Sequence, residues 1–140
     1  MLITKNKKAY FDYEILKEFS TGMILTGAEV RSCRAKQVDL KGAYVSEIGE
    51  ELWLKGAKIH KFKHDQTGTH EVERNRKLLL NKKEIIKIIT ELNTSGVTLI
   101  PLEIFTLGPL LKLKIALARG RKKYDKRELI KNRDIERRKY

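Results

Sequence analysis

A strict alternation of apolar residues near the end of the chain constrains the fold most. In LLKLKIALA, residues 110–118, Leu111, Leu113, Ile115 and Leu117 alternate with lysine or alanine. Successive side chains of a strand point to opposite faces, so the pattern predicts a strand with its lysines and alanines outward. The turn TLGP, residues 106–109, separates this strand from VTLIPLEIF, residues 97–105, and predicts a hairpin. Pro101 cannot donate to a ladder, so it should lie at an edge or a bulge.

Further short strands are expected upstream. The stretch AYFDYEILKEF, residues 9–19, alternates, and a turn signal at Thr21-Gly22 separates it from MILT, residues 23–26. AYVSEI, residues 43–48, and ELWLKGAKI, residues 51–59, flank Gly49-Glu50, which is typical of a hairpin. The strand expected over residues 9–19 should place these side chains on one face: Phe11, Tyr13, Ile15 and Phe19.

Two segments have helical signals. Asn81 and Glu84 form a capping-box pattern before an apolar stripe at helical spacing, which predicts an amphipathic helix over about residues 81–95, ended by Gly96. TGAEVRSCRA, residues 26–35, should form two turns capped by Thr26. In the helix expected over residues 81–95, the apolar stripe consists of Ile85, Ile88, Ile89 and Leu92. We therefore predict a mainly β fold with helices: an oligonucleotide-binding-type closed β-barrel of about six strands.

The charge of the chain indicates a polyanionic partner. Its 31 Lys and Arg residues against 18 Asp and Glu give a net charge of +13. Nucleic acid is the favoured partner, and an anionic membrane surface is the alternative. No segment approaches the roughly 20 apolar residues of a membrane span. Cys33 is the single cysteine, so no internal disulfide forms, and a reducing, cytoplasmic setting is expected.

Composition changes sharply at Arg119. Residues 119–140 hold eleven Lys or Arg and four Asp or Glu, a net +7, whereas residues 1–118 have a net +6. We therefore predict an RNA-binding barrel domain over 1–118 and a basic C-terminal tail over 119–140. Within the tail, Tyr124 lies among cations without apolar neighbours, which suits stacking on a nucleotide base.

The sequence contains no pattern for catalysis or for a cofactor. There is no GxSxG elbow, Walker loop or HExxH. His60 and His64 are spaced i, i+4, and His70 follows, but no second cysteine completes a metal set. We expect a protein that is not an enzyme and that carries no metal or cofactor, with these histidines in a solvated loop.

Basic residues gather in three runs, together with the outward lysines of the strand 110–118. Such runs are often only a solvated face, but several on one small barrel favour an RNA surface. The runs are Lys5, Lys7 and Lys8; Arg31, Arg34 and Lys36; and Arg74, Arg76 and Lys77.

Several segments, in the same order over nearly the whole chain, resemble one family. NKKAYFDY, LTGAEVRSCRA, RKLLLN, ALARGRKKYDKR and IKNRD resemble the SmpB (small protein B) family of tmRNA-binding proteins of trans-translation. The resemblance implies an oligonucleotide-binding-type barrel that binds the tRNA-like domain of tmRNA as a monomer. It also implies action in the decoding site of ribosomes stalled on messenger without a stop codon. The elongation factor that delivers aminoacyl-tRNA would be a partner indirectly, through tmRNA.

Family contact positions carry over where residues match. They are Asn6-Lys7-Lys8, Leu79, Asn81 and Lys112, while Ser20 stands where the family commonly has an acidic residue. A polar contact, without a carboxylate, is therefore expected at Ser20. The full set of predicted tmRNA-binding residues is Asn6, Lys7, Lys8, Ser20, Arg31, Arg34, Arg76, Leu79, Asn81 and Lys112.

The resemblance also implies a role for the tail, which would be disordered alone and helical in the empty messenger channel. Residues 126–139 lack Gly and Pro and contain opposite charges at i+3 and i+4, so a helix is physically accessible. Two alternatives remain: a ribosomal or translation-factor barrel not specific for tmRNA, and an RNA nuclease. The predicted ribosome-binding residues are Arg121, Lys122, Lys123, Tyr124, Asp125, Lys126 and Arg127.

Overall fold

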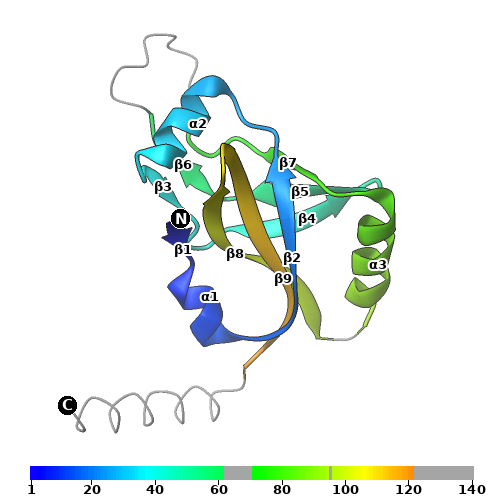
Figure 1. Ribbon diagram of the computed structural model, residues 1–140. Helices are drawn as coiled ribbons and strands as arrows, with labels where there is room; N and C mark the ends of the chain where they lie inside the picture. The colour runs from blue at the N-terminus through cyan, green and yellow to red at the C-terminus, as the bar shows by residue number, and fades with distance from the viewer. Residues whose placement is uncertain (62–70, 95, 122–140) are drawn as a thin grey trace, which may run out of the picture.

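A curved antiparallel sheet dominates the computed structural model, which describes residues 1–61, 71–94 and 96–121 (Figure 1). The main sheet has seven strands in the order β1-β8-β9-β2-β7-β5-β4, and β3 pairs with β6 separately. The strands are β1 Leu2–Lys5, β2 Tyr13–Met23, β3 Val38–Asp39, β4 Tyr44–Ile48, β5 Glu51–Lys55, β6 Lys58–Ile59, β7 Arg76–Leu79, β8 Val97–Leu107 and β9 Leu110–Gly120. The helices are α1 Lys7–Asp12, α2 Gly27–Arg34 and α3 Lys82–Leu92. The mainly β fold is confirmed.

The sheet curls around one core without closing. Val45 of β4 and Ile3 of β1 belong to the same buried cluster as Ile115 of β9, although β4 and β1 are at opposite ends of the strand order. Cα atoms of β4 and β8 approach within 8 Å, but among the described residues no ladder joins these strands. The predicted closed barrel is therefore not found: the sheet is open between β4 and β8, where residues of α1, β8 and the start of β4 line a cleft.

Helix α1 was missed by the sequence analysis, which predicted a strand there. Asn6 caps the helix: its Oδ1 accepts from the Ala9 amide at 3.3 Å, and its Nδ2 donates to the Pro101 carbonyl at 3.1 Å. Ala9 then packs on Ala116 and Ala118 of β9. These two alanines, predicted to face outward, are buried because small side chains let α1 approach the sheet closely.

Two bulges change which face a strand presents. The register of β8 shifts between Pro101 and Glu103, so the predicted bulge at Pro101 is confirmed. The register of β2 shifts between Ile15 and Lys17. Because a bulge adds one residue to its strand, Ile15 packs beneath α1 whereas Phe19 packs on the main core. The prediction of one continuous face was wrong, as was the turn at Thr21-Gly22, since β2 runs on to Met23.

The predicted β4–β5 hairpin and the predicted caps of the helices are confirmed. Gly49 and Glu50 both have positive φ, at 51° and 56°, and form the two-residue loop between β4 and β5. Thr26 and Glu29 make both bonds of a capping box at α2. Asn81 Oδ1 accepts from the Glu84 amide at 2.8 Å and starts α3, which ends at Leu92, earlier than predicted. Within the described parts of the chain, no helix has the length and apolar character needed to span a membrane.

Candidate nucleic-acid interface

Three predicted contact residues lie on the surface of strands β8, β9, β2 and β7 that faces away from the core. We call this surface the outer face and define it by Lys112, Lys114, Ser20, Gly22 and Leu79. Lys114 pairs with Ser20, and Gly22 pairs with Leu79. Cross-strand partners share a face, and Lys112 is on the same face of β9 as Lys114. The register thus gathers Ser20, Leu79 and Lys112, which are far apart in the sequence.

Leu79 lies beside Gly22 on the outer face and is exposed there. Its side chain retains 53% of its accessible surface, and a Cβ atom at Gly22 would meet the Leu79 Cβ at 3.4 Å. The Thr21 hydroxyl donates to the Leu79 carbonyl at 3.0 Å and ties the backbone of β7 to β2. An exposed leucine held in this way suits contact with a sugar or base.

The two outer-face lysines differ in their partners. Lys114 Nζ lies 3.5 Å from Glu103 Oε2 and 3.8 Å from Glu18 Oε2. Among the described residues, no carboxylate lies within 4.0 Å of the Lys112 ammonium. Lys112 is therefore the outer-face cation that remains available for a phosphate.

A polar network links the outer face to α1. The Tyr10 hydroxyl donates to Glu103 Oε1 at 2.9 Å, and Lys5 Nζ lies 4.6 Å from the centre of the Tyr10 ring. Burial and the neighbouring Glu103 carboxylate raise the pKa of Tyr10 above its usual value. The tyrosine stays protonated and fixes the position of α1 relative to β8.

Arg76, predicted to bind RNA, is a core residue. Its side chain is 0% exposed, and its Nε and Nη2 donate to Glu29 Oε2 at 2.8 and 2.6 Å. Its Nη1 donates to the Ala57 carbonyl at 2.8 Å. The guanidinium thus joins β7 to α2, and this placement corrects the prediction that it faces RNA. Sequence alone did not separate it from the surface cations around it.

Glu29 is held ionised beneath the surface. Burial by itself raises the pKa of a carboxyl group, but hydrogen bonds from Arg74, the Thr26 amide and Arg76 outweigh it and lower the pKa of Glu29 to about 2. Nearby, burial raises the pKa of the Cys33 thiol to about 11. Cys33 is therefore a protonated core residue and no nucleophile.

The two candidate arginines of α2 lie at the surface. Arg34 Nη2 donates to the Pro109 carbonyl at 2.6 Å, which places α2 beside the loop of the β8–β9 hairpin. Lys112 lies in β9 near that loop, so Arg34 is placed at the same end of the hairpin as Lys112. Arg31 is exposed on the same helix.

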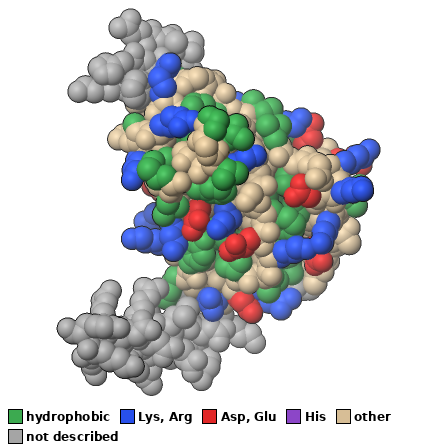
Figure 2. Space-filling model, in the orientation of Figure 1, with side chains coloured by type: hydrophobic (Ala, Val, Ile, Leu, Met, Phe, Trp, Pro, Cys, Tyr) green, Lys and Arg blue, Asp and Glu red, His purple; other side chains and the backbone are tan. Residues whose placement is uncertain are grey.

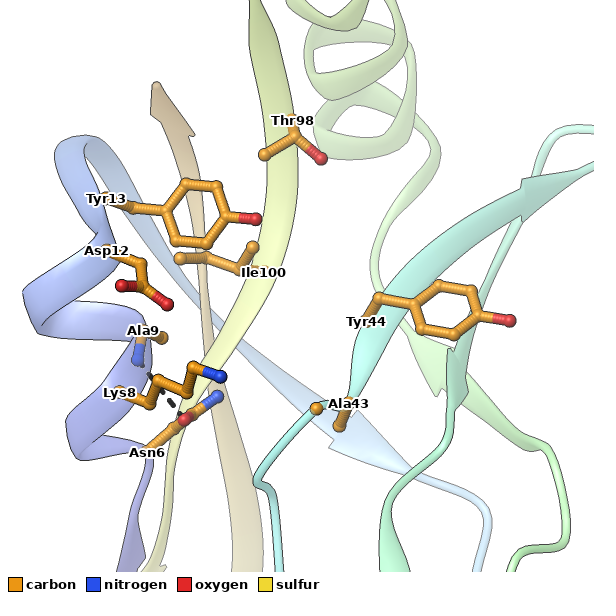
Figure 3. A pocket seen from close by; sticks show the side chains of 10 residues that line it. Asn6, Lys8, Ala9, Asp12, Tyr13, Ala43, Tyr44, Thr98 and Ile100 are labelled. Carbon is orange, nitrogen blue, oxygen red and sulfur yellow. Dashed lines mark hydrogen bonds between the residues drawn. The ribbon is translucent and has the colours of Figure 1, made fainter. Parts of the chain in front are cut away.

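The N-terminal candidates lie elsewhere. Figure 1 shows α1 near the end of the sheet opposite the β8–β9 loop. Asn6 is buried and makes the two bonds described above, so it positions α1 instead of facing a partner. Lys7 and Lys8 are exposed, and Lys8 lines a cleft of about 270 Å³ with Asp12, Tyr13 and Tyr44 (Figure 3).

The tail begins beside α1. The Arg121 amide donates to the Asp12 carbonyl at 2.8 Å, and its Nε donates to the Tyr13 carbonyl at 3.2 Å. The predictions for residues 122–127 lie outside the described residues, as do those for His64 and His70. His60 is exposed. In the described residues there is no group of three or more His, Cys, Asp or Glu placed to hold a metal ion.

The face of the molecule seen in Figure 2 carries both basic and acidic side chains. Figure 2 shows lysine and arginine side chains spread over this face, with acidic groups between them. Sequence analysis missed Gly22 and the Glu18–Lys114–Glu103 ion pairs, because they depend on which strands become neighbours. A small basic β protein with cations on a sheet face belongs to the class that binds a polyanion such as RNA.

Comparison with known proteins narrows this class. The family described as "SmpB protein" matches residues 3–140, and the chain belongs to the SmpB family. It is 47% identical to the SsrA-binding protein of Wolbachia pipientis subsp. Culex pipiens, covering 99% of this chain and 93% of that protein. The SsrA-binding protein of Bdellovibrio bacteriovorus is 42% identical, with 96% and 89% covered.

A solved structure shares the fold. The chain matches one from the structure described as "tmRNA-SmpB: a journey to the center of the bacterial ribosome" with a TM-score of 0.71 and 36% identity. The match covers 86% of this chain and 85% of the other. Members of the SmpB family are RNA-binding proteins and not enzymes, so the nuclease alternative is set aside.

Proposed function

We propose that this chain binds tmRNA, also called SsrA RNA, and delivers it to stalled ribosomes for trans-translation. The observation that carries the proposal is family membership over residues 3–140, with relatives named SsrA-binding proteins that match 96–99% of the chain. The curved sheet, on this proposal, is an oligonucleotide-binding-type barrel left open between β4 and β8.

The outer face is the proposed contact with the tRNA-like domain. Lys112 would bind a phosphate, Leu79 would pack on a sugar or base, and Ser20 and Asn81 would add polar contacts. Arg31 and Arg34 would extend the contact from α2, and Lys7 and Lys8 would bind from the far end of the sheet. Asn6 would hold these two lysines in place, and Arg76 is left out because it is buried.

On this proposal the two parts of the chain, the body over 1–118 and the tail over 119–140, bind different partners. The body would hold tmRNA as a monomer, and the tail would enter the decoding site and the empty messenger channel. The elongation factor would meet the protein only through tmRNA, and the complex would work in the cytoplasm. In the structure β9 runs through Gly120 and Arg121 bonds to Asp12 and Tyr13, so the first residues of the proposed tail, 119–121, are held on the body.

The direct test is to identify the RNA that co-purifies with the full-length protein from its bacterial host. We expect tmRNA to be enriched relative to ribosomal RNA. Recovery of ribosomes without tmRNA would instead indicate a ribosomal or translation-factor protein and would overturn the proposal.

A second experiment tests the tail. Asp125, Lys126 and Arg127, all replaced by alanine, should leave tmRNA affinity unchanged while tagging of nascent chains on non-stop messenger is lost. Asp125 is proposed to cap the tail helix, and a lost cap alone costs about 1 kcal/mol. A gel shift with tmRNA run beside the tagging assay separates the two steps. Normal tagging by the triple variant would refute the role of the tail.

A further inference from the structure

A row of side chains crosses the outer face and extends it as far as β1. Leu2 of β1 pairs with Phe105 of β8, and Phe105 pairs with Lys112 of β9. The register between β9 and β2 places Gly22 next to Lys112, and Gly22 pairs with Leu79 of β7. Because cross-strand partners share a face, these residues form one line across five neighbouring strands of the sheet. We call this line the outer-face row, and it consists of Leu2, Phe105, Lys112, Gly22 and Leu79.

The outer-face row is apolar on both sides of Lys112 and largely open to solvent. Leu2 keeps 46% of its surface exposed, Leu79 is exposed, and Phe105 is half-buried. Leu107 pairs with Leu110 at the tip of the β8–β9 hairpin, with 62% and 54% exposed. Leu107 is two residues beyond Phe105, so alternation puts this leucine pair on the same face. Packing in the core does not account for so many exposed apolar side chains on one face, and patches of this kind mark a contact with a partner.

The charges along the row favour a polyanionic partner. Lys112 lies within the row, and among the described residues no carboxylate is within 4.0 Å of its ammonium. Residues 105–112 contain no Asp or Glu. Arg34 brings a second cation to the hairpin tip through its bond to the Pro109 carbonyl. An apolar surface with cations and without carboxylates fits the bases and phosphates of RNA, whereas a protein partner needs an acidic side chain opposite Lys112.

A polar row runs beside the outer-face row, and its carboxylate is already occupied. Glu103 pairs with Lys5 of β1 and with Lys114 of β9. Its Oε1 accepts from the Tyr10 hydroxyl at 2.9 Å, and its Oε2 lies 3.5 Å from Lys114 Nζ. Glu103 is therefore not available to select a base by the hydrogen bonds of its edge. Contact along the outer-face row depends instead on the faces of bases, which all four bases have.

We propose that the outer-face row binds an unstacked loop of tmRNA, with one base on the Phe105 ring and the adjoining phosphate on Lys112. Unstacked bases are recognised by stacking on aromatic side chains, and lysine binds phosphate as a point charge. Neighbouring strands are about 4.8 Å apart, so Phe105 and Leu79 lie about 14 Å apart and contact different nucleotides of the loop. Leu2 and the leucines of the hairpin tip exclude water around the stacked base. The inference rests on the proposed function, because the loop belongs to tmRNA.

Phe105→Leu in the full-length protein tests the stack, with Phe105→Tyr as its matched control. Leucine keeps an apolar side chain but removes the ring, whereas tyrosine keeps the ring. Phe105→Leu should weaken tmRNA binding at least about fivefold, the lower limit for loss of a base–aromatic stack, and Phe105→Tyr should bind as wild type does. Thermal denaturation shows whether both variants are folded at the temperature of the binding assay. Wild-type affinity in Phe105→Leu, or an equal loss in two folded variants, would overturn the proposal.

Amide NMR of the full-length, isotope-labelled protein tests the row without any large RNA. The probes are hexauridylate, hexaadenylate and, as a phosphate without bases, tripolyphosphate. We expect saturable shifts at Leu2, Phe105 and Leu79 with both oligonucleotides, and a shift only at Lys112 within the row with tripolyphosphate. Equal shifts with all three probes would report phosphate attraction alone and would overturn the proposal. Absence of shifts in the row with either oligonucleotide would also overturn it and would favour a protein partner for this surface.

Leu2→Ala tests whether the row extends to β1, with Leu16→Ala as its matched control. Leu16 is 44% exposed, close to the 46% of Leu2, but lies in β2 well before Gly22 and outside the row. Leu2→Ala should weaken tmRNA binding, and Leu16→Ala should not. Equal affinities of the two variants would overturn the proposal that the row acts as one surface.

Normal tmRNA binding by Phe105→Leu would overturn the proposal for the row and leave the proposed function standing. Failure of the unaltered protein to bind tmRNA would overturn the proposed function instead. The oligonucleotide titration would still report on the row in that case, so the two failures are distinguishable.

Discussion

Two charged regions of this protein use the same residue types in opposite ways. In the Glu29–Arg74–Arg76 cluster, one buried carboxylate accepts bonds from two guanidinium groups and joins α2 to the segment that leads into β7. On the outer face, Lys112 remains unpaired among the described residues while Lys114 is bound by two carboxylates. The comparison shows that a cation serves the fold or the partner according to its burial and its neighbours, not according to local charge density.

The difference has energetic consequences. A buried ion pair that loses one member leaves an uncompensated charge away from water, which costs about 3–5 kcal/mol. An exposed cation contributes little to stability, since surface ion pairs are typically worth less than about 1 kcal/mol. Substitutions in the buried cluster should therefore change the free energy of unfolding, and substitutions on the outer face should change RNA affinity.

The largest effect is expected for Glu29→Gln. Loss of the carboxylate charge leaves Arg76 buried beside a neutral amide, and the free energy of unfolding should fall by about 3–5 kcal/mol, as measured by urea denaturation. Glu73→Gln is the matched control, because Glu73 is exposed and lies 4.0 Å from Lys58. The control should change stability by less than about 0.5 kcal/mol. Equal stability of the two variants would contradict the assignment of the cluster to the fold.

Acid should weaken the same cluster. The pKa of Glu29 falls from its usual 4.5 to about 2 in the folded protein, so folding favours the ionised form. The resulting stability, about 3 kcal/mol, is present above pH 4.5 and is lost as the pH falls toward 2. Urea denaturation of wild type and Glu29→Gln across this window should show a loss that is larger in wild type by about this amount. Identical pH profiles would refute the account of Glu29.

Asn6→Ala should lower the free energy of unfolding by less than Glu29→Gln does. Such a loss would show that Asn6, like the buried cluster, serves the fold and not RNA binding. The variant removes the cap of α1 and the bond to the Pro101 carbonyl, so stability should fall by about 1–2 kcal/mol. Thermal denaturation measures this loss, and tmRNA affinity measured well below the transition should change little. Unchanged stability together with lost tmRNA affinity would show that Asn6 contacts RNA directly.

Sequence patterns predicted correctly those features of the fold that depend on residues close together in the chain. The alternation around Leu113, the hairpin at Gly49-Glu50 and the caps Thr26 and Asn81 are all present, because strand period, turn conformation and capping are set within a few residues. Helix α1 was missed because Phe11 alternates with Tyr13 and Ile15 as in a strand, and because the stability of the helix comes from Asn6 and from packing on β9.

Non-local features could not be predicted in the same way. The run Arg74, Arg76 and Lys77 looks uniform in sequence, yet Arg76 is buried because Glu29 arrives from a helix 47 residues away in the chain. The opening between β4 and β8 likewise depends on which strands pair across the whole sheet. Lys112 was identified correctly as outward, since its strand alternates cleanly, but its lack of a carboxylate partner required the positions of Glu18 and Glu103.

The measurement that most directly tests the central claim is the salt dependence of tmRNA binding for Lys112→Ala beside Lys114→Ala. The two lysines share a strand and a face and differ in their ion pairs. If Lys112 binds a phosphate, Lys112→Ala should weaken binding and make the slope of log affinity against log salt concentration shallower by about 0.7–0.9. Lys114→Ala should leave the slope of wild type. Equal slopes for wild type and Lys112→Ala, or the larger change in Lys114→Ala, would contradict the account.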